Sequence, residues 1–403
     1  MQRPPVLVLG SGLTALGAIR LLHSAGYAPF VIGDDGGMAS RSRWFRAAPK
    51  PASGACAVDD LAAYLHALPF SSRAPLVPCS DAWVRRVAAI VDTIDDRFPS
   101  SVPAPGVLER LIDKWQLAEL LRALELPHPP TFALECGTDV STIPESVIAR
   151  AFLKPRDSGR FFQQFGVKAF HVRSRGEIAT RLAEILPTGL GIQLQEYVPG
   201  PPENHYYVEG FIDRAGRLHG PFLRRRLRMY PVDFGNSTYF ESAPPTAVPD
   251  AVETIKRLLA SVSFHGLFSA EFKLDQRDGI CRLLDVNVRP WWYVEFAGQC
   301  GLNFCDMLVR DALGQQQRTA RPYRVGFRCV YPYYDFAACK TQRGTGSLAI
   351  RRWAGSWVTS TQPVFRWTDP MPAVGGVARM LARRFARFFR GHQSKARALT
   401  GVV

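Results

Sequence analysis

Two carboxylates and an amide in the C-terminal half of the chain have a spacing that suits metal chemistry. Glu271 lies in one strand pattern, while Asp285, Asn287 and Arg289 occupy alternate positions of a second one. Alternate residues of a strand point to one face. A short turn would join the strands as an antiparallel hairpin, so that Glu271 lies across from Asp285 or Asn287. Carboxylate and amide oxygens are ligands that Mg²⁺ prefers. A solvent-facing polar strand is the alternative for this hairpin taken alone.

Two lysines could hold the phosphate groups of a nucleotide. Lys154 lies in the strand pattern AFLKP and precedes residues 156–166, which we expect to form a flexible loop that contains Ser158. A lysine at the base of such a loop can hold phosphate oxygens while the loop folds over them. The loop is not a Walker A loop, because GxxxxGK followed by Ser or Thr is absent. Lys114 lies in a predicted helix, where an ordinary surface charge is the alternative.

A hinge that could meet an adenine follows the strand pattern GIQLQEYV. Residues 199–203 are rich in proline and glycine, and such a hinge offers backbone N–H and C=O groups to the edge of an adenine ring. The carboxylates of Glu196 and Glu203 could accept hydrogen bonds from an amino group and from ribose hydroxyls. A surface turn with solvated acids is the alternative.

Arginines are concentrated in the segment RRRLRMY. Residues 205–213 and 217–228 are typical of paired strands, and the second strand carries Arg226 and Arg228. The planar guanidinium group matches carboxylate and phosphate groups in a bidentate geometry. The segment therefore indicates a surface for an acidic substrate or a phosphate. A solvated basic edge strand is the alternative.

The N-terminal residues, which must support these groups, predict a β-α-β unit. Strand patterns at Val6–Leu9 and Ala28–Gly33 flank a helix pattern at Ala15–Ala25. The first turn, GSGLTALG, together with Asp34 after the second strand, could hold a dinucleotide. Its glycines follow GxGxxxxG and not GxGxxG, which favours a tight strand-to-helix turn that binds no nucleotide.

The composition indicates a globular protein of two or three domains. Of the 403 residues, 47% are hydrophobic and 21% are charged, as in ordinary globular proteins. The net charge of +15 comes mainly from 42 arginines, and either anionic substrates or an arginine-rich genome would account for it. No nucleic-acid-binding motif is visible, so we expect no nucleic-acid partner.

Cysteine usage and hydropathy predict a cytoplasmic location. The 8 cysteines include no CxxC pair and no Cys/His metal spacing, which is typical of reduced thiols. The N-terminal apolar run is broken by glycines and lacks a small-residue cleavage site, which argues against a signal peptide. No run of about 18 apolar residues, the length needed to span a bilayer, is present.

In their order along the chain, these features resemble the ATP-grasp superfamily of ligases. The resemblance covers about Val6 to Leu313 and rests on IDKWQLAELLRALELPHPPTF, FLKP, QEYVPG with Glu203, SAEFKLD and LLDVNVRP. Each piece alone is weak, but their order and spacing together are fairly specific. The chain is most similar to D-aspartate-ligase-like carboxylate–amine ligases. This resemblance implies an enzyme that forms an amide from a small carboxylate and an amine, through an acyl phosphate, and releases ADP and phosphate.

The resemblance implies ATP and Mg²⁺ as cofactors, with Mn²⁺ as an alternative metal. The phosphates of ATP would meet Lys114, Lys154 and the loop with Ser158. The adenine would meet Glu196 and the backbone of Tyr197 and Val198, and the ribose would meet Glu203. The metal ligands would be Glu271, Asp285 and Asn287. On the substrate side, Arg289 would orient the substrate or acyl phosphate, and Arg226 and Arg228 would face the γ-phosphate and the acidic substrate.

The chain departs from the family pattern in two places. The loop after Lys154 lacks the run of glycines that many relatives have, and Asp285 stands where glutamate is common. The shorter side chain keeps the charge but reaches less far. In addition, Trp291 and Trp292 follow the substrate arginine. These rings either form an apolar wall of the substrate pocket or pack beneath it.

The resemblance also implies a fold class and its domains. The class is α/β and α+β, with a Rossmann-like domain that has no dinucleotide of its own, followed by a two-subdomain ATP-grasp fold. We expect residues 1–105 to form the first domain, 106–205 the central subdomain with a linker helix at 108–124, 206–320 the C-terminal subdomain, and 321–403 an extension.

The C-terminal extension lies beyond the resemblance. Val325–Tyr331 and Ser347–Arg352 have strand patterns. Residues 373–390 have the pattern of a basic amphipathic helix, with apolar residues on one side and arginines over much of the rest. Such a helix could contact an anionic membrane surface, or it could cover the enzyme's own core or form a homodimer contact.

Two other functions stay open from the sequence. A nicotinamide- or flavin-dependent oxidoreductase would use the glycine-rich first turn and Asp34, but it leaves the segment Glu271–Arg289 unexplained. A non-catalytic nucleotide-binding module would keep the ATP-grasp frame without turnover. The presence of both lysines and all three metal ligands argues against it.

Overall fold

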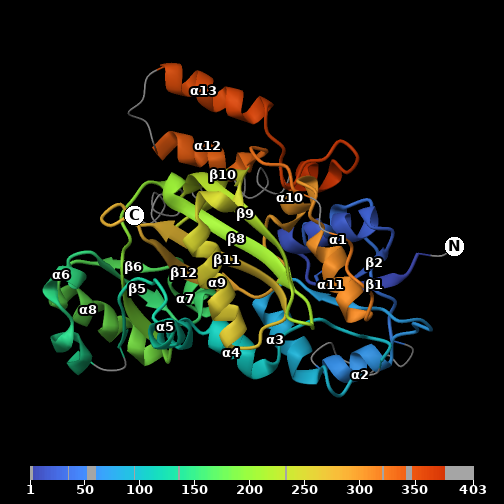
Figure 1. Cartoon of the computed structure of the whole chain (residues 1–403), viewed down its shortest axis with the longest axis horizontal. Helices are drawn as coiled ribbons and strands as arrows, with labels where there is room; N and C mark the ends of the chain where they lie inside the picture. Colours follow the sequence, from blue (N-terminus) through green and yellow to red (C-terminus); the bar gives the residue numbers. More distant parts are fainter. Residues whose placement is uncertain are drawn as a thin grey trace, which may run out of the picture.

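The computed structural model describes residues 3–34, 36–51, 60–94, 96–134, 137–231, 234–319, 322–341 and 347–376. These residues form three β-sheets with helices packed around them (Figure 1). The sheets follow one another along the chain, and together they position the side chains that the sequence predicts to be functional.

The N-terminal sheet is parallel and has the strand order β2-β1-β3. Its strands are β1 (Pro5–Leu9), β2 (Ala28–Ile32) and β3 (Leu76–Pro78), and its helices are α1 (Leu13–Ser24), α2 (Leu61–His66) and α3 (Asp81–Ile90). Strand β1 is buried along most of its length because neighbouring elements cover both faces, and this explains its continuous apolar run. The predicted β-α-β unit is present.

The glycine-rich first turn packs against the chain itself. A Cβ atom at Gly33 would lie 2.9 Å from the backbone carbon of Gly10, so the loop after β2 lies directly on the turn. A Cβ atom at Gly17 would lie 3.2 Å from Val294 Cγ1, which shows how closely α1 approaches α10 (Val294–Gln299). Close packing therefore accounts for Gly17 and Gly33, whereas a Cβ atom at Gly12 would meet nothing within 4 Å.

The central sheet is antiparallel and has the order β4-β7-β5-β6. Its strands are β4 (Thr131–Leu134), β5 (Ala151–Pro155), β6 (Phe170–Val172) and β7 (Ile192–Glu196), and the helices of this region are α4 (Pro105–Ile112), α5 (Lys114–Ala123), α6 (Glu145–Ile148), α7 (Ser158–Phe165) and α8 (Arg175–Ile185). The sheet and helices α6, α7 and α8 share a hydrophobic core that includes Leu153, Phe161 and Leu194. This part of the chain, the central subdomain, is therefore packed around its own core.

The predicted linker helix at 108–124 is wrong in detail, because it is two helices. The chain leaves helical geometry at Asp113, where α4 ends and α5 begins. Asp113 Oδ1 accepts hydrogen bonds from Trp115 N at 2.9 Å and from Gln116 N at 3.0 Å. An aspartate at this position stabilises a helix start, and it turns α5 so that its first residue, Lys114, can reach a neighbouring strand.

The flexible loop predicted for residues 156–166 is also wrong, because most of it is helix α7. Asp157 caps the helix, and its Oδ1 accepts hydrogen bonds from Gly159 N at 2.9 Å and from Arg160 N at 3.0 Å. Gly166 ends the helix with a φ of 69°, a conformation that favours glycine. Both helix signals are present in the sequence and outweigh the polar composition of the segment.

The C-terminal sheet is antiparallel and has the order β12-β11-β8-β9-β10-β13. Its strands are β8 (His205–Ile212), β9 (Leu218–Tyr230), β10 (Asn236–Ala243), β11 (Gly266–Leu274), β12 (Cys281–Asn287) and β13 (Arg328–Val330), and it packs against α9 (Pro249–Ser261) and α11 (Phe304–Ala312). One continuous core joins Leu7 of the N-terminal sheet to Val208 and Phe272 of this sheet. The N-terminal domain and the C-terminal sheet thus form one packed body.

The C-terminal extension is built onto this sheet. Strand β13 pairs with β10 and lies within the predicted strand Val325–Tyr331. Ser347–Arg352, also predicted as a strand, belongs to helix α13 (Ser347–Val358), which lies beside α12 (Pro332–Thr341) above β9 and β10 (Figure 1). The second strand prediction is wrong because a short apolar run fits a strand and a helix equally well.

Residues 371–376 begin a last helix. The remainder of the basic amphipathic helix predicted at 373–390 lies outside the described residues, and so do the membrane and homodimer contacts expected of it. In the part of the chain that is described, no helix combines the length and apolarity needed to cross a membrane.

A buried carboxylate, Asp335 of α12, holds the extension on the sheet. It accepts two hydrogen bonds from Arg228 of β9, each at 2.8 Å. The indole N–H groups of Trp353 and Trp357 in α13 each donate to the same carboxylate at 2.8 Å, and so does the hydroxyl of Thr238. One charge therefore joins α12, α13 and two strands of the sheet.

Replacing Asp335 with alanine should destabilise the protein strongly. The change leaves the charge of Arg228 and two indole N–H groups without their acceptor, and breaking a buried ion pair in this way costs about 3 to 5 kcal/mol. We expect a loss of this size in the free energy of unfolding, measured by urea denaturation. Glu241→Ala is the control, because its partner Arg328 is half exposed and the pair contributes at most about 1 kcal/mol. Equal losses in both variants would contradict the central role of Asp335.

Candidate functional site

The candidate site is centred on the hairpin of β11 and β12. The strand register places Glu271 directly across from Asp285, and Ser269 across from Asn287. A bulge directly after Glu271 shifts the register of the next pair. Residues that face each other in a ladder share one side of the sheet, so Glu271, Asp285 and Asn287 point the same way. Of the two partners expected for Glu271 from the sequence, Asp285 is the observed one.

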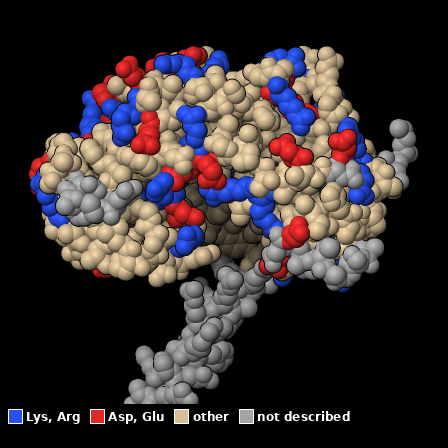
Figure 2. All heavy atoms as spheres, turned by 90° about the horizontal axis from the view of Figure 1, so that it is seen from below, with Lys and Arg blue, Asp and Glu red and all other residues tan. Residues whose placement is uncertain are grey.

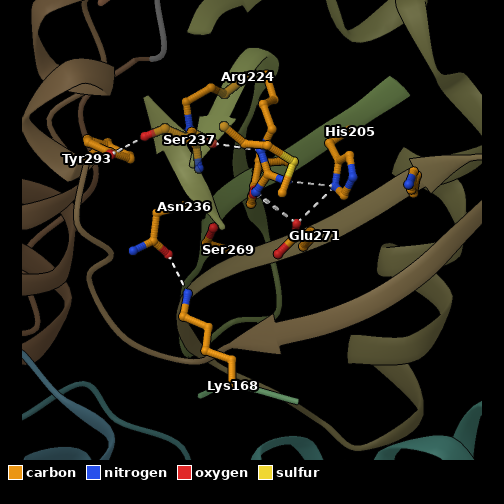
Figure 3. A network of polar contacts seen from close by, with 12 residues as sticks. Lys168, His205, Arg224, Asn236, Ser237, Ser269, Glu271 and Tyr293 are labelled. Atoms are coloured by element: carbon orange, nitrogen blue, oxygen red, sulfur yellow. Dashed lines mark hydrogen bonds and ion pairs between the residues drawn. The ribbon is translucent and has the colours of Figure 1, made fainter. Parts of the chain in front are cut away.

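Three side chains surround one oxygen of the Glu271 carboxylate (Figure 3). Tyr207 Oη donates to Glu271 Oε1 at 2.9 Å, Arg226 Nη2 donates at 3.0 Å, and His205 Nδ1 lies 3.0 Å away. Burial would raise the pKa of Glu271, but the charge of Arg226 and the hydrogen bonds hold this pKa well below its usual range. Glu271 therefore stays ionised at neutral pH.

His205 does not supply the charge that balances Glu271. Burial, helped by the nearby charge of Arg226, lowers the pKa of His205 to about 4. The imidazole is therefore neutral near pH 7, and the guanidinium of Arg226 carries the compensating positive charge. Arg226 is itself buried, and its Nε donates to Ser237 Oγ at 3.0 Å, which fixes its orientation.

Both predicted phosphate lysines reach the hairpin. Lys114 Nζ lies 2.7 Å from Asp285 Oδ1, and Lys154 Nζ donates to the carbonyl oxygen of Leu284 at 2.8 Å. The charges of the two lysines lower the pKa of Asp285, although burial acts to raise it. Burial and the charge of Lys114 lower the pKa of Lys154 to about 8. The fold thus gathers α5, β5 and β12 around one polar face.

The oxygen atoms on this face fit a hard divalent cation. No residue in the described ranges donates a hydrogen bond to Glu271 Oε2 or Asp285 Oδ2, and Asn287 Oδ1 accepts one from Arg289 Nη2 at 3.2 Å. Ionised carboxylates with a free oxygen, beside an amide oxygen, are donors that Mg²⁺ prefers. The described residues contain no group of three or more His, Cys, Asp or Glu side chains that could hold a metal, so the predicted site would also need the amide oxygen of Asn287. The metal assignment stays a prediction.

The predicted adenine hinge follows β7. The carboxylate of Glu196 is buried and accepts hydrogen bonds from Arg277 at 2.5 and 3.2 Å, so it is already engaged within the protein. The N–H of Tyr197 donates to the carbonyl of Arg150 at 2.7 Å. The backbone N–H and C=O of Val198 have no hydrogen-bond partner among the described residues. The same holds for the backbone N–H and C=O of Gly200, so the hinge has unpaired backbone groups at both residues, although Val198 itself is buried.

Two further predicted nucleotide contacts lie in short turns or at helix ends. Glu203 belongs to the turn Pro202–Asn204, and its carbonyl accepts a hydrogen bond from Arg225 Nε at 2.9 Å. Strand β9 thus fixes the position of this turn. Ser158 is the first residue of α7, and its side chain lies outside what the structure describes. The roles of both residues stay predictions.

The three predicted substrate arginines have different partners. Arg226 lies against Glu271, as described above. Arg289 binds Asp81 in a bidentate manner, with Nε–Oδ1 at 2.8 Å and Nη2–Oδ2 at 3.2 Å, and so joins the hairpin to the N-terminal domain. Arg228 is bound by the buried carboxylate of α12. The structure therefore brings Arg226 and Arg289 to the hairpin and ties Arg228 to the C-terminal extension.

The two tryptophans after Arg289 have separate environments. Trp291 is buried and packs on Phe304, with ring centroids 5.5 Å apart. Trp292 is 41% exposed. Of the two interpretations from the sequence, packing beneath the site fits Trp291, and a wall of the substrate pocket fits Trp292.

The sequence analysis missed four residues in or beside the site. His205 and Tyr207 alternate on β8, which pairs with β11, and this spacing was a signal that could have been used. Asp81 begins α3, and Lys168 precedes β6, with its Nζ 2.9 Å from Asn236 Oδ1. No local pattern marks Asp81 or Lys168, because each meets its partner only through the tertiary fold.

A hollow opens on the face shown in Figure 2. Basic and acidic side chains gather along its edge, while uncharged residues form much of its interior. A recess with a few charged groups at its edge suits a ligand that carries phosphate or carboxylate groups.

The sequence is similar to that of one curated ligase, and no protein-family model matches the chain. D-aspartate ligase from Enterococcus faecium (strain Aus0004) is 24% identical over 244 residues, which are 59% of this chain and 58% of that enzyme. The matched region thus spans a little over half the length of either protein.

Solved structures share the fold over a larger part of the chain. The ADP complex of N5-carboxyaminoimidazole ribonucleotide synthetase has a TM-score of 0.62 at 12% identity and covers 81% of both chains. L-amino acid ligase from Bacillus licheniformis has a TM-score of 0.61 at 14% identity and covers 81% of this chain and 79% of that one. These similarities confirm the predicted mixed α/β fold class, and the Rossmann-like character of the N-terminal domain stays a prediction.

The pKa of Lys154 predicts that nucleotide affinity depends on pH. The ammonium group is charged below about pH 8 and can bind phosphate, whereas above that pH a growing fraction of the free protein has a neutral amine. Phosphate binding then takes up a proton, so we expect the affinity for ADP to fall by up to about tenfold per pH unit above this value. Isothermal titration calorimetry across this pH range measures the effect.

Lys154→Arg is the matched variant, because an arginine stays charged throughout this range. Its affinity for ADP should change little over the same interval. A fall of equal size in the wild type and the variant would show that another group causes the dependence.

Proposed function

We propose, from the ATP-grasp fold that this chain shares with these ligases, that it is an ATP-dependent ligase joining a carboxylate to an amine. The observation that carries the proposal is the pairing of Glu271 with Asp285 in a hairpin that both Lys114 and Lys154 reach. Oxygen ligands for a cation and ammonium groups for phosphates then lie on one face. Transfer of a phosphoryl group requires this combination, because negative charge spreads over the group as it moves.

ATP would lie between the central subdomain and the C-terminal sheet. Lys114 and Lys154 would bind its phosphates, and the open backbone groups of Val198 would pair with its adenine. Glu203, in the turn fixed by β9, would accept hydrogen bonds from the ribose hydroxyls. Because Arg277 already binds the carboxylate of Glu196, we expect the backbone of the hinge to recognise the adenine in place of this side chain.

Glu271, Asp285 and Asn287 would hold Mg²⁺, or Mn²⁺, which shares its preference for oxygen ligands. When bound, the metal would supply positive charge that stabilises the phosphate oxygens during transfer. The protein's part is to keep the ligands ionised and oriented. Arg226 does this for Glu271, and Lys114 does it for Asp285.

The reaction would proceed in two steps that need no further reactant. An oxygen of the substrate carboxylate attacks the γ-phosphorus of ATP, and the bond from this phosphorus to the β–γ bridging oxygen breaks. The products of this step are an acyl phosphate and ADP. The amine nitrogen then attacks the acyl carbon, phosphate leaves with the oxygen it shares with that carbon, and the nitrogen loses a proton. The side chains position the reactants and offset charge without forming covalent bonds.

Arg289 would mark the substrate side of the site. A guanidinium group suits a carboxylate or an acyl phosphate, and Asp81 holds Arg289 at the contact between the hairpin and the N-terminal domain. The exposed ring of Trp292 lies three residues further along the chain and would contribute an apolar wall. The substrates would therefore be small molecules that bind between the N-terminal domain and the hairpin.

The other functions considered from the sequence have less support. An oxidoreductase would need the glycine-rich turn for a dinucleotide, but the turn departs from the GxGxxG pattern, and packing against α10 accounts for Gly17. A non-catalytic module would bind ATP without releasing ADP, and the assay below distinguishes it.

The chain should release ADP from ATP when Mg²⁺, a suitable carboxylate and an amine are present. A coupled assay of ADP over pooled carboxylates and amines tests this, with D-aspartate as the first acid because the similar ligase is named for it. Glu271→Gln keeps the size of the side chain and removes its charge, so ADP release should fall by about 100-fold or more. Glu241→Gln, which alters a carboxylate paired with the half-exposed Arg328, should keep the wild-type rate.

Two outcomes would count against the proposal. ADP release that survives in Glu271→Gln would remove the hairpin from the mechanism. Binding of ATP without ADP release from any acid and amine would favour the non-catalytic module.

A further inference from the structure

Lys168 reaches from the central subdomain to the C-terminal sheet. It lies between α7 and β6, and its Nζ donates to Asn236 Oδ1 of β10 at 2.9 Å (Figure 3). The central subdomain has a hydrophobic core of its own, separate from the core that joins the N-terminal domain to the C-terminal sheet. Lys168 therefore connects two separately packed parts of the protein.

The charges that act on Lys168 are those of the candidate site. Glu271 and Asp285 act to raise its pKa, while burial and the charge of Arg226 lower it. Figure 3 shows the side chain directed toward Asn236, on the side of the sheet where Glu271 lies. Among the described residues, the partner of Lys168 Nζ is the neutral amide of Asn236, and no carboxylate lies within ion-pair distance of it. A cation in this position can take an anionic ligand.

Helix α7 leaves few backbone N–H groups that could bind a phosphate after Lys154. The segment after Lys154 would have to present free backbone N–H groups in order to wrap a phosphate. In this chain Asp157 caps α7 and takes up the N–H groups of Gly159 and Arg160, and its negative charge disfavours an anion at that end. A positively charged side chain beyond the other end of α7 can replace the missing backbone donors.

We propose that Lys168 is a third phosphate-binding lysine, which contacts the terminal phosphate of ATP. The inference rests on the proposed function. Glu271 and Asp285 would hold the metal that neutralises charge on the terminal phosphates, so a cation on which both carboxylates act would lie at that end of the nucleotide. On binding ATP, Lys168 exchanges the amide oxygen of Asn236 for a phosphate oxygen and fastens the central subdomain over the nucleotide.

Nucleotide binding tests this role without requiring the ligase reaction. The affinities of Lys168→Met for Mg–ADP and for the non-hydrolysable Mg–AMP-PNP are compared by isothermal titration calorimetry. A hydrogen bond to a charged group is worth about 10- to 100-fold in affinity, so AMP-PNP should bind more weakly by that factor. The affinity for ADP should stay within about twofold of the wild type, because ADP lacks the terminal phosphate.

Three matched variants complete the experiment. Lys168→Arg keeps the charge and should restore most of the affinity for AMP-PNP. Lys256→Met removes an exposed lysine of α9 and should leave both affinities unchanged. Asn236→Ala removes the observed partner of Lys168 and should not lower the affinity for AMP-PNP relative to the affinity for ADP.

The outcomes separate this proposal from the function on which it rests. Equal losses for ADP and AMP-PNP in Lys168→Met, no loss for either, or the same selective loss in Asn236→Ala would each overturn the role of Lys168. In those cases wild-type binding of AMP-PNP and ADP release would leave the proposed function intact. A wild-type chain that binds neither nucleotide would overturn both.

Discussion

The ion pair between Arg226 and Glu271 is the interaction on which the candidate site depends. Burial alone would favour a neutral Glu271, and a neutral acid could not help to hold a divalent cation. The guanidinium of Arg226 offsets that effect and fixes one carboxylate oxygen, so the other stays available. Strand β9 must therefore pass through the middle of the C-terminal sheet, between β8 and β10, where Arg226 can reach across β8 to β11. The solvated basic edge strand considered from the sequence is for this reason wrong.

Arg226 is one of three alternate arginines on β9 that each bind a carboxylate from a different element. Arg224 binds Glu209 of β8 at 2.7 Å, Arg226 binds Glu271 of β11 at 3.0 Å, and Arg228 binds Asp335 of α12 at 2.8 Å. The first two pairs lie inside the sheet, and the third attaches the extension. Since removing one partner of a buried pair leaves an uncompensated charge, the three pairs specify how these elements assemble. Arg224, Arg226 and Arg228 are thus already paired within the protein, and the cations that we propose for a nucleotide are lysines.

The sequence predicted those parts of the site that depend on local spacing. Glu271 and Asp285 could be paired from strand alternation and a short turn, because both rules act over few residues. The predicted strand and helix boundaries are wrong where a polar residue caps a helix, as Asp157 does for α7. Contacts made only by the tertiary fold could not be predicted: Arg228 lies 107 residues from Asp335, and Arg289 lies 208 residues from Asp81. That Lys114 and Lys154 lie near the hairpin could be predicted only because the order of the motifs resembles that of a known family.

The residues of the candidate site belong to two bodies, each with a hydrophobic core of its own. Arg289, Asp81 and the hairpin of β11 and β12 belong to the body formed by the N-terminal domain and the C-terminal sheet, which one core joins. Lys154 and the hinge after β7 belong to the central subdomain, which has its own core. Polar contacts such as that of Lys154 with Leu284 join the two bodies, and such contacts are easily exchanged for phosphate oxygens. The buried leucines of α5 belong to the first core, so Lys114 and Lys154 approach the hairpin from different bodies. If ATP binds as we propose, the two bodies would together position the phosphoryl group before transfer.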